Sequence, residues 1–137
     1  MGSELLDSMT ISAQGMRVQG TRIRVISENI ADTAATSPGA DPYRRQIITF
    51  KNEMDRKLDL KTVRVDDIDV DKKSPFILKY LPDHPGANAD GYVKMPNVNT
   101  MVEMMDVREA QRSYEANLTM IEQARGMVNR TIDILKN

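Results

Sequence analysis

A single histidine and a short acidic run are the residues of this sequence whose chemical types could support a reaction or a metal site. His84 lies in a proline-rich turn, and the chain has no cysteine and no second histidine that could share a metal ion or form a nucleophile and base pair. The alternate aspartates of residues 67–71 have the spacing that opens an EF-hand calcium loop, but Lys72 and Leu78 occupy the positions that need glycine and glutamate. We therefore expect a solvated histidine and a solvated acidic strand, with no enzyme activity, no metal and no cofactor.

Two other patterns could bind phosphate groups. Residues 15–21 have the glycine spacing of a phosphate-binding loop, but Thr21 stands at the lysine position and the segment falls within a predicted helix. Arg17, Arg24 and the pair at 44–45 are not interleaved with aromatic residues, and the 19 basic residues are balanced by 20 acidic ones. These charges predict a solvated or ion-paired surface, with neither nucleic acid nor a small-molecule substrate as partner.

The N-terminal segment, from about residue 4 to residue 31, has no proline and a 3,4 spacing of apolar and small residues that predicts a long helix. Small residues recur every seven positions in this row and would let a partner backbone approach, while the large ones between them would fill holes. The row consists of Leu6, Met9, Ala13, Met16, Gly20, Ile23, Ser27 and Ile30.

The C-terminal segment, from about residue 100 to residue 135, predicts a second long helix. Thr100 and Glu103 have the spacing of a capping box at its start. The polar residue of its row, Asn117, either fixes the register of a helix pair or turns to solvent. The large members of this row are Val107, Tyr114, Ile121, Val128 and Leu135, and Ala110, Asn117, Ala124 and Thr131 alternate with them.

Residues 33–99 between the two helices are rich in proline and glycine and predict loops with short strands. Alternating segments at 45–51 and 62–70, a run at 76–81, and the turn before Tyr92 indicate a small β-ribbon. The predicted fold is mainly α, with long N- and C-terminal helices paired as a coiled coil and a small irregular β-containing middle. We divide it into residues 1–32, 33–99 and 100–137, with the first and last forming one discontinuous core domain.

Both ends of the chain resemble a known family. Residues 29–33, Asn-Ile-Ala-Asp-Thr, are similar to the signature that ends the first helix in the axial proteins of the bacterial flagellum, with Asp32 where the family usually has asparagine. Residues 96–99, followed by 103–104 and 112–117, resemble the second signature of that family. The phrases at 42–45, 82–85 and 87–93 are similar to its C-type proximal rod subunits.

The resemblance implies a structural subunit of the flagellar basal body that assembles in the periplasm with copies of itself and other rod proteins to transmit motor torque. It also implies export through the flagellar type III apparatus without a cleaved signal. No apolar run approaches the length of a membrane span, and the acidic start lacks the parts of a signal peptide. The predicted site is an interface made of Asn29 and the two heptad rows.

Two other classes of function remain open on the residues alone. A soluble helical adaptor or export chaperone could bind a partner helix in a groove lined by some of the 10 methionines. It would form a discrete complex instead of a polymer. A small hydrolase would have only carboxylates for acid and base catalysis, and a metal analysis with an activity screen would detect it.

Overall fold

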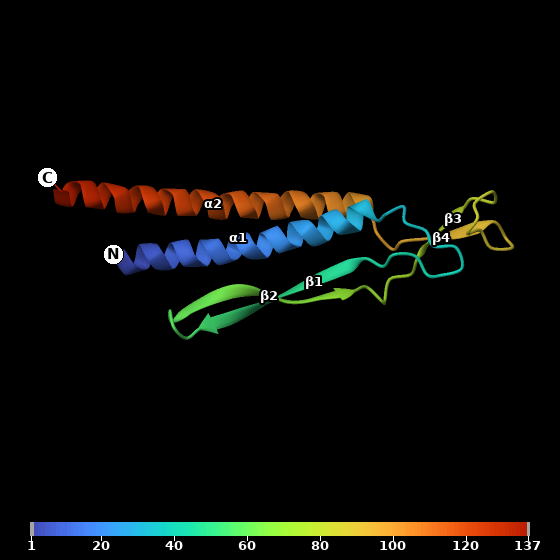
Figure 1. Cartoon of the computed structure of the whole chain (residues 1–137), viewed down its shortest axis with the longest axis horizontal. Coiled ribbons are helices and arrows are strands. Elements are labelled where there is room, and N and C mark those ends of the chain that lie inside the picture. The colour runs from blue at the N-terminus through green and yellow to red at the C-terminus, as the bar shows by residue number, and fades with distance from the viewer. Residues whose placement is uncertain (1, 137) are drawn as a thin grey trace.

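The computed structural model describes residues 2–136, which form an elongated molecule (Figure 1). Its element order is helix, two hairpins and helix; the sequence predicts the two helices and a single small β-ribbon, whereas the strands form two separate two-stranded sheets. The elements are α1 (Gly2–Ala31), β1 (Gln46–Asp55), β2 (Leu60–Val70), β3 (Ile77–Tyr80), β4 (Tyr92–Met95) and α2 (Thr100–Lys136). The two helices and a small antiparallel β-containing middle confirm the predicted content.

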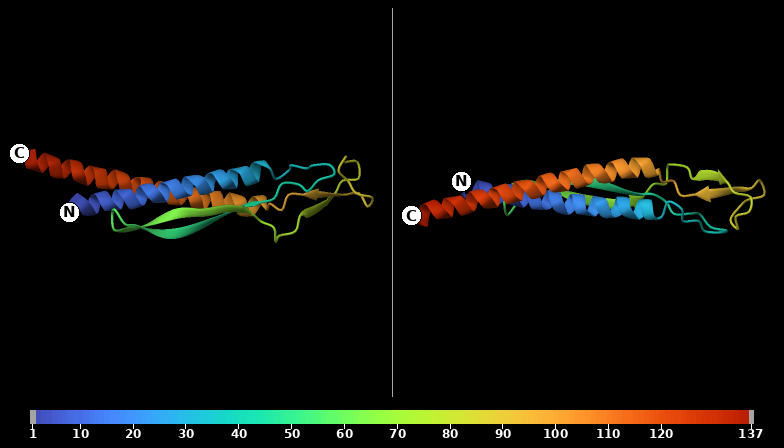
Figure 2. Two further views of the ribbon diagram at one scale, coloured as in Figure 1. Left: turned by 60° about the horizontal axis from the view of Figure 1, so that its bottom comes forward. Right: turned by 90° about the horizontal axis from the view of Figure 1, so that it is seen from above.

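The molecule has three layers, with α1 in the centre. α2 lies along one side of α1 and the β1–β2 hairpin along the other, while the β3–β4 hairpin projects beyond the end where α1 stops and α2 starts (Figures 1 and 2). Of the elements within residues 2–136, α2 contacts only α1. The outward side of α2 and the outward side of the hairpin are therefore both open.

The helices run antiparallel in a constant register. Gly15 lies beside Asn117, and Asn29 donates a hydrogen bond to Glu103. These contacts are 14 residues apart on both helices, and Arg22, midway between Gly15 and Asn29, pairs with Asp106 and Glu109. The register between the two helices is therefore the same over two heptads.

The predicted heptad row of α1 is one residue out of phase with the observed contacts. Positions 15, 22 and 29 meet α2, each one residue before the predicted Met16, Ile23 and Ile30. The phase differs because α1 has two neighbours: its remaining buried side chains, such as Val18 and Val25, line the side toward the β1–β2 hairpin. A pattern assumed to serve one partner could not separate these two faces.

The start of α2 also differs from the prediction. The side chain of Asn99 caps the helix, because its Oδ1 accepts hydrogen bonds from the backbone N–H groups of Met101 at 3.1 Å and Val102 at 3.3 Å. The predicted capping box of Thr100 and Glu103 is wrong, since the Glu103 carboxylate is fully buried and points to other partners.

A β-bulge in the β1–β2 hairpin aligns its apolar residues. Phe50 pairs with Val65 and Thr49 pairs with Asp67, so Asp66 is an extra residue on β2. Side chains alternate between the two faces of a strand. Without the bulge, residues 63 and 65 would therefore point to one face of the hairpin and residues 68 and 70 to the other. With it, one face carries Ile48, Phe50, Val63, Val65, Ile68 and Val70, and we call these six residues the hairpin strip.

The core is narrow and is made of small side chains. Its fully buried apolar residues are Val18, Val25, Ile26, Val93, Val98, Ala110 and Ala124. At the far end, Gly91 adopts a φ of 82°, and a Cβ there would lie 2.8 Å from the ring of Tyr80. This glycine lets the Tyr80 and Tyr92 rings stack edge to face across β3 and β4.

Candidate functional site

The residues with the most reactive side chains lie in loops and on an exposed strand. The His84 Nδ1 accepts a hydrogen bond from the Gly86 backbone N–H at 3.0 Å, and its Nε2 lies 3.4 Å from the Thr36 hydroxyl. Within residues 2–136, no three His, Cys, Asp or Glu side chains are grouped closely enough to hold a metal ion. Asp71 instead caps a turn, and hydrogen bonds from the hydroxyl and backbone N–H of Ser74 lower the pKa of its carboxyl.

A group of buried, hydrogen-bonded polar side chains is centred on Asn29, at the end of α1. The side chain is 1% exposed and all of its hydrogen-bonding capacity is used. Its Oδ1 accepts from the Tyr43 hydroxyl and from the Gln46 backbone N–H, both at 2.8 Å. Its Nδ2 donates to the Gln46 carbonyl at 3.0 Å and to Glu103 at 3.3 Å. One amide therefore ties α1 to the start of β1 and to α2.

Glu103 and Arg45 form the charged part of the same group. The Glu103 side chain is 1% exposed and pairs with the Arg45 guanidinium, which is 26% exposed. The same guanidinium lies 3.8 Å from Asp106. A buried carboxylate requires such partners because its desolvation is otherwise costly.

Asn97 connects this group to the segment that leads into β3. Its Oδ1 accepts from the Arg45 backbone N–H at 2.8 Å, and its Nδ2 donates to the carbonyls of Asp71 at 3.1 Å and Ser74 at 3.2 Å. We call Asn29, Tyr43, Arg45, Asn97 and Glu103 the polar junction.

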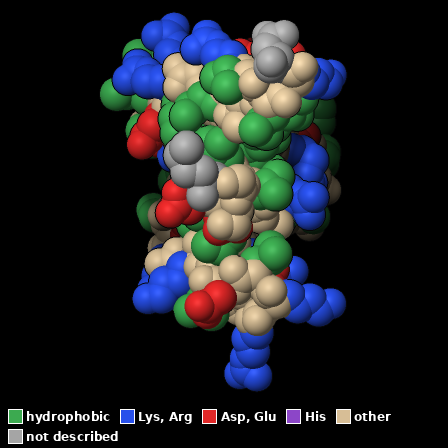
Figure 3. Space-filling model, turned by 90° about the vertical axis from the view of Figure 1, so that its left-hand side faces the viewer, with side chains coloured by type: hydrophobic (Ala, Val, Ile, Leu, Met, Phe, Trp, Pro, Cys, Tyr) green, Lys and Arg blue, Asp and Glu red, His purple; other side chains and the backbone are tan. Residues whose placement is uncertain are grey.

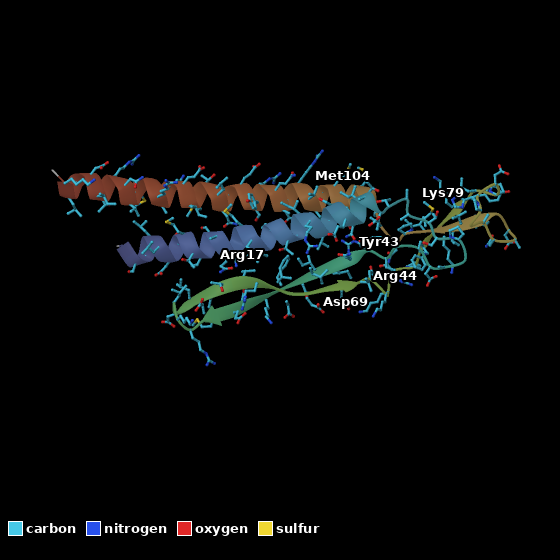
Figure 4. The ribbon with its side chains drawn as sticks, viewed as in Figure 1. Arg17, Tyr43, Arg44, Asp69, Lys79 and Met104 are labelled. Carbon is cyan, nitrogen blue, oxygen red and sulfur yellow. The ribbon has the colours of Figure 1, made fainter. Side chains whose placement is uncertain are left out.

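Tyr43 is the titratable residue of the polar junction whose environment is most unusual. Figure 4 places it next to the start of β1, close to the end of α1. Burial raises the pKa of its hydroxyl, and the negative charges of Asp32, Glu28 and Glu103 raise it further. The hydroxyl therefore stays protonated and donates to Asn29. The polar junction holds geometry, and Asn29, Arg45 and Glu103 also line a shallow hollow between the helices and β1.

The polar junction was only partly foreseen from the sequence. Asn29 was expected to form an interface, and it is buried inside the chain. The sequence predicts Glu103 as part of a helix cap and Arg45 as part of a solvated or ion-paired surface, and it gives Tyr43 no role beyond the phrase at 42–45. The sequence does contain a signal. Asn99 is a better helix cap than Thr100, so Glu103 is not needed in a capping box and is free for another role.

Most of the predicted row on α1 lies at or near the surface. Leu6 is 61% exposed, and a Cβ at Gly20 would have no atom within 4 Å. The expected close approach at Gly20 is therefore not made within the chain. Leu6, Ala13 and Ser27 are exposed, and Met9, Met16, Gly20, Ile23 and Ile30 are half-buried.

The predicted row on α2 agrees better with the observed contacts between the helices than the predicted row on α1 does. Three of its small members, Ala110, Asn117 and Ala124, face α1, and Asn117 lies against Gly15 instead of turning to solvent. The fourth, Thr131, is exposed. Tyr114 is 36% exposed and Leu135 is 81% exposed. Ala110 and Ala124 are buried, and Val107, Asn117, Ile121 and Val128 are half-buried.

Large apolar side chains remain open on every layer. At the end that carries both termini, hydrophobic side chains are exposed among charged ones (Figure 3). On α2, Met101 and Met105 are about 70% exposed, and Ile134 near its C-terminus is 75% exposed. Where such residues form a contiguous patch, they mark a candidate site of association with another protein.

Comparison with known proteins agrees with an assembling subunit. Residues 89–134 match the family model described as flagellar basal body rod FlgEFG protein C-terminal. The chain is 49% identical to the flagellar basal-body rod protein FlgC of Agrobacterium fabrum, over 92% of this chain and 91% of that protein. The chain belongs to the FlgC family of flagellar basal-body rod proteins. It is 38% identical to the FlgC protein of Borreliella burgdorferi and 33% identical to that of Bacillus subtilis, over at least 94% of each chain.

Membership of the FlgC family makes the chain a structural subunit of the flagellar basal-body rod. The match to the C-terminal model spans β4 and nearly all of α2. It therefore includes Asn97 and Glu103, two members of the polar junction. Neither helix in the described part of the chain is long and apolar enough to cross a membrane.

Proposed function

We propose that this FlgC-family chain assembles in the proximal rod with copies of itself and with other rod proteins, and that the resulting shaft transmits motor torque. The observation that carries the proposal is the apolar surface that remains open on a rigidly joined helix pair, above all on α2. Transmission of torque needs many lateral contacts and no reactive group. The polar junction supports this role because it keeps the hairpin and both helices in a single orientation.

The helix pair acts as an antiparallel coiled coil in this proposal. Support comes from the register, since Gly15 meets Asn117 and Asn29 meets Glu103 two heptads further along. The helices, residues 1–32 and 100–137, form one discontinuous core domain in the inner layer of a tube. Residues 33–99 reach neighbouring subunits. The predicted rows and Asn29 belong to this interface: the exposed members contact neighbours, and the buried ones set its shape.

The chain reaches the rod through the flagellar type III export apparatus, without a cleaved signal peptide, and assembles in the periplasm. This part of the proposal rests on the family to which the chain belongs and on the narrow core and exposed apolar side chains of the subunit. A subunit with a narrow core and open apolar faces is well suited to export in an extended form and to folding against its neighbours.

Electron cryo-microscopy of purified basal bodies tests the proposal directly. We expect density for this chain in the rod, with residues 2–31 and 100–136 paired near the axis and the β1–β2 hairpin further out. Intact rods that lack the chain would contradict the proposal. A discrete soluble complex would then favour an adaptor or export chaperone.

A further inference from the structure

The strand edges of the two hairpins differ in how their outward backbone groups are satisfied. In an antiparallel pair, alternate residues direct their N–H and C=O groups away from the partner strand. On β1 the outward groups of Gln46 bond to the Asn29 side chain, and on β4 those of Tyr92 bond to Asn88. An edge whose outward groups are not bonded in this way can pair with another strand.

β3 has such an open edge. The Leu81 N–H donates to the Gly91 carbonyl across the hairpin at 2.9 Å. The alternation therefore directs the N–H and C=O groups of Leu78 and Tyr80 away from β4. Within residues 2–136, these four groups have no backbone hydrogen-bond partner. Leu78 is 61% exposed and Tyr80 is 62% exposed, so β3 can accept a further extended strand.

The base of β2 has a second open edge. The Asp71 N–H donates to the Arg45 carbonyl at 2.8 Å, so the alternation directs the backbone groups of Ile68 and Val70 away from β1. At this end β1 lies between α1 and β2, because the outward groups of Gln46 bond to α1. The edge of β2 therefore points away from both helices (Figure 1).

Two aspartates occupy this edge of β2 in the single chain. Asp67 Oδ1 accepts the N–H of Ile68 at 2.8 Å, and Asp69 Oδ1 accepts the N–H of Val70 at 2.7 Å. Both contacts are exposed and join adjacent residues, so the carbonyl groups of a neighbouring strand can replace them. Ile68 and Val70 are themselves 37% exposed.

The two open edges match in an antiparallel pair. Placing Leu78 opposite Val70 brings the outward groups of both residues together, so that they can exchange two hydrogen bonds. Tyr80 then lies opposite Ile68 in the same way. Opposite residues carry their side chains on the same face, so these four apolar side chains pack together on one face of the joined sheet.

The residues between these pairs carry opposite charges. Lys79 lies opposite Asp69 on the other face of the joined sheet, and a cross-strand pair of this kind is stabilising. If β3 instead paired with β3 of another copy so that Leu78 met Tyr80, Lys79 would lie opposite Lys79. Like charges in opposite positions are destabilising, so β3 favours the acidic edge of β2 over its own edge.

We propose that β3 of one copy adds to the edge of β2 in a second copy of this chain, so that the two hairpins join as one sheet in the order β1–β2–β3–β4. The contact joins two unlike edges and leaves one of each free, so it can repeat from copy to copy. A ribbon of two strands is only marginally stable, and the joined sheet stabilises both hairpins. The contact deepens the proposed function, on which it rests, by naming the strand edges that join neighbouring copies.

Disulfide cross-linking tests the contact, since the chain has no native cysteine. In the proposed pair the Cα atoms of residues 69 and 79 are about 4.5 Å apart, within the range of a disulfide. Among residues 2–136 of one chain, β2 and β3 make no contact, and Figure 4 shows Asp69 and Lys79 on separate hairpins. After oxidation, purified basal bodies from cells that carry Asp69→Cys with Lys79→Cys should contain dimers and longer ladders of the chain.

The matched control is Arg64→Cys with Lys79→Cys. The Arg64 side chain is 60% exposed on β2, but it lies five residues from Asp69, which is roughly 16 Å along a strand. This control should give no ladder. If Asp69→Cys with Lys79→Cys gives only a faster-migrating monomer, the two strands meet within one chain and the proposed contact is wrong.

Charge reversal tests the register of the same contact. The variant Val70→Cys with Leu78→Cys serves as the reporter, because this opposed pair is about 5.5 Å apart and can also form a disulfide. Lys79→Glu and Asp69→Lys should each reduce the yield of the reporter ladder, and the combined variant should restore it. Lys61→Glu, near the other end of β2, should have little effect. Single reversals that leave the yield unchanged would overturn the proposed register.

The outcomes separate this contact from the proposed function. If the chain is present in rods but neither double-cysteine variant gives a ladder, the contact is wrong and the rod subunit stands. If the only product joins the chain to a different rod protein, the second copy is wrong. If rods of unmodified cells lack the chain, both proposals fail.

Discussion

Gly15 of α1 lies directly against the side-chain amide of Asn117 on α2. A Cβ added at Gly15 would be 2.8 Å from Nδ2 and 3.0 Å from Oδ1 of Asn117. The amide cannot turn away freely, because its Nδ2 donates to the Ser113 carbonyl at 2.9 Å. The small residue that brings the helices together is thus Gly15, and it lies outside the row that the heptad pattern selects.

Replacing Gly15 with leucine should destabilise the isolated chain. The larger side chain must displace Asn117 and push the helices apart, and overpacking of this kind costs about 1–3 kcal/mol in the free energy of unfolding. Thermal unfolding followed by circular dichroism measures the loss. The matched control is Gly20→Leu, since a Cβ at Gly20 meets no atom within 4 Å.

The two glycine variants should also differ in assembly. Gly20→Leu should leave the melting temperature of the monomer almost unchanged and still reduce rod assembly, if the open side of α1 packs on a neighbour. A melting temperature that falls equally in both variants would contradict the helix register described here.

Removing the Glu103 carboxylate should be one of the most damaging single changes in the polar junction. Glu103→Ala leaves the Arg45 guanidinium and one N–H of Asn29 without their partner. Breaking a buried pair in this way costs roughly 3–5 kcal/mol, and we expect the lower end because Arg45 is 26% exposed. Chemical denaturation should show this loss, whereas Glu109→Ala, whose side chain is 70% exposed, should change stability by less than about 0.5 kcal/mol. Equal effects would show that Glu103 is solvated.

Tyr43 should make the stability of the chain fall at alkaline pH. The pKa of its hydroxyl is raised in the folded chain, so the unfolded chain loses this proton first as the pH rises through about 10. The contribution of Tyr43 is therefore complete below that pH and is lost as the pH approaches the raised value. Tyr43→Phe should cost about 0.5–1.5 kcal/mol at neutral pH through the lost hydrogen bond to Asn29, and the difference from the unmodified chain should shrink above pH 10.

The Tyr80→Phe variant is the control for this pH dependence. Tyr80 is 62% exposed and lies on β3, away from the polar junction. Its stability profile should follow that of the unmodified chain from neutral to alkaline pH. A constant difference between Tyr43→Phe and the unmodified chain across pH 10 would show that the Tyr43 hydroxyl does not ionise with unfolding.

The elements of this fold could be predicted from the sequence because proline and glycine confine them. Both helices begin and end within two residues of the predicted limits, and each strand overlaps a predicted segment, although β1 extends four residues beyond its segment. The phase of α1 could not be predicted, since a periodic row does not say how many partners a helix has. Here Gly15 and Arg22 contact α2, while Val18 faces the hairpin.

The polar junction was hidden for a different reason. Asn29 and Glu103 are 74 residues apart, and each is a common surface residue type when it is considered alone. Only the constant helix register brings them together, and only the turn before β1 adds Tyr43 and Arg45. The hairpin strip was equally hidden, because its two halves have opposite alternation until the bulge at Asp66 aligns them.

The C-terminal end of α2 should be the least stable part of the isolated chain. Extending the register of Gly15 and Asn117 places Gly2 beside Arg130, so residues 131–136 have no α1 neighbour, and Figure 1 shows α2 extending past the N-terminus. Ile134 is 75% exposed and Leu135 is 81% exposed. Helical segments without tertiary contacts are marginal in water.

Hydrogen exchange at low protein concentration should therefore show rapid exchange at the backbone amides of residues 131–136 and strong protection around Ala110. In assembled rods the same terminal amides should become protected, because neighbours cover Ile134 and Leu135. Replacing these two residues with serine should change the free energy of unfolding of the monomer by less than about 0.5 kcal/mol. The same change should reduce assembly. Strong protection of the terminal amides in a dilute monomer would mean that α2 is stable without a neighbour, and the open apolar end would then need another explanation.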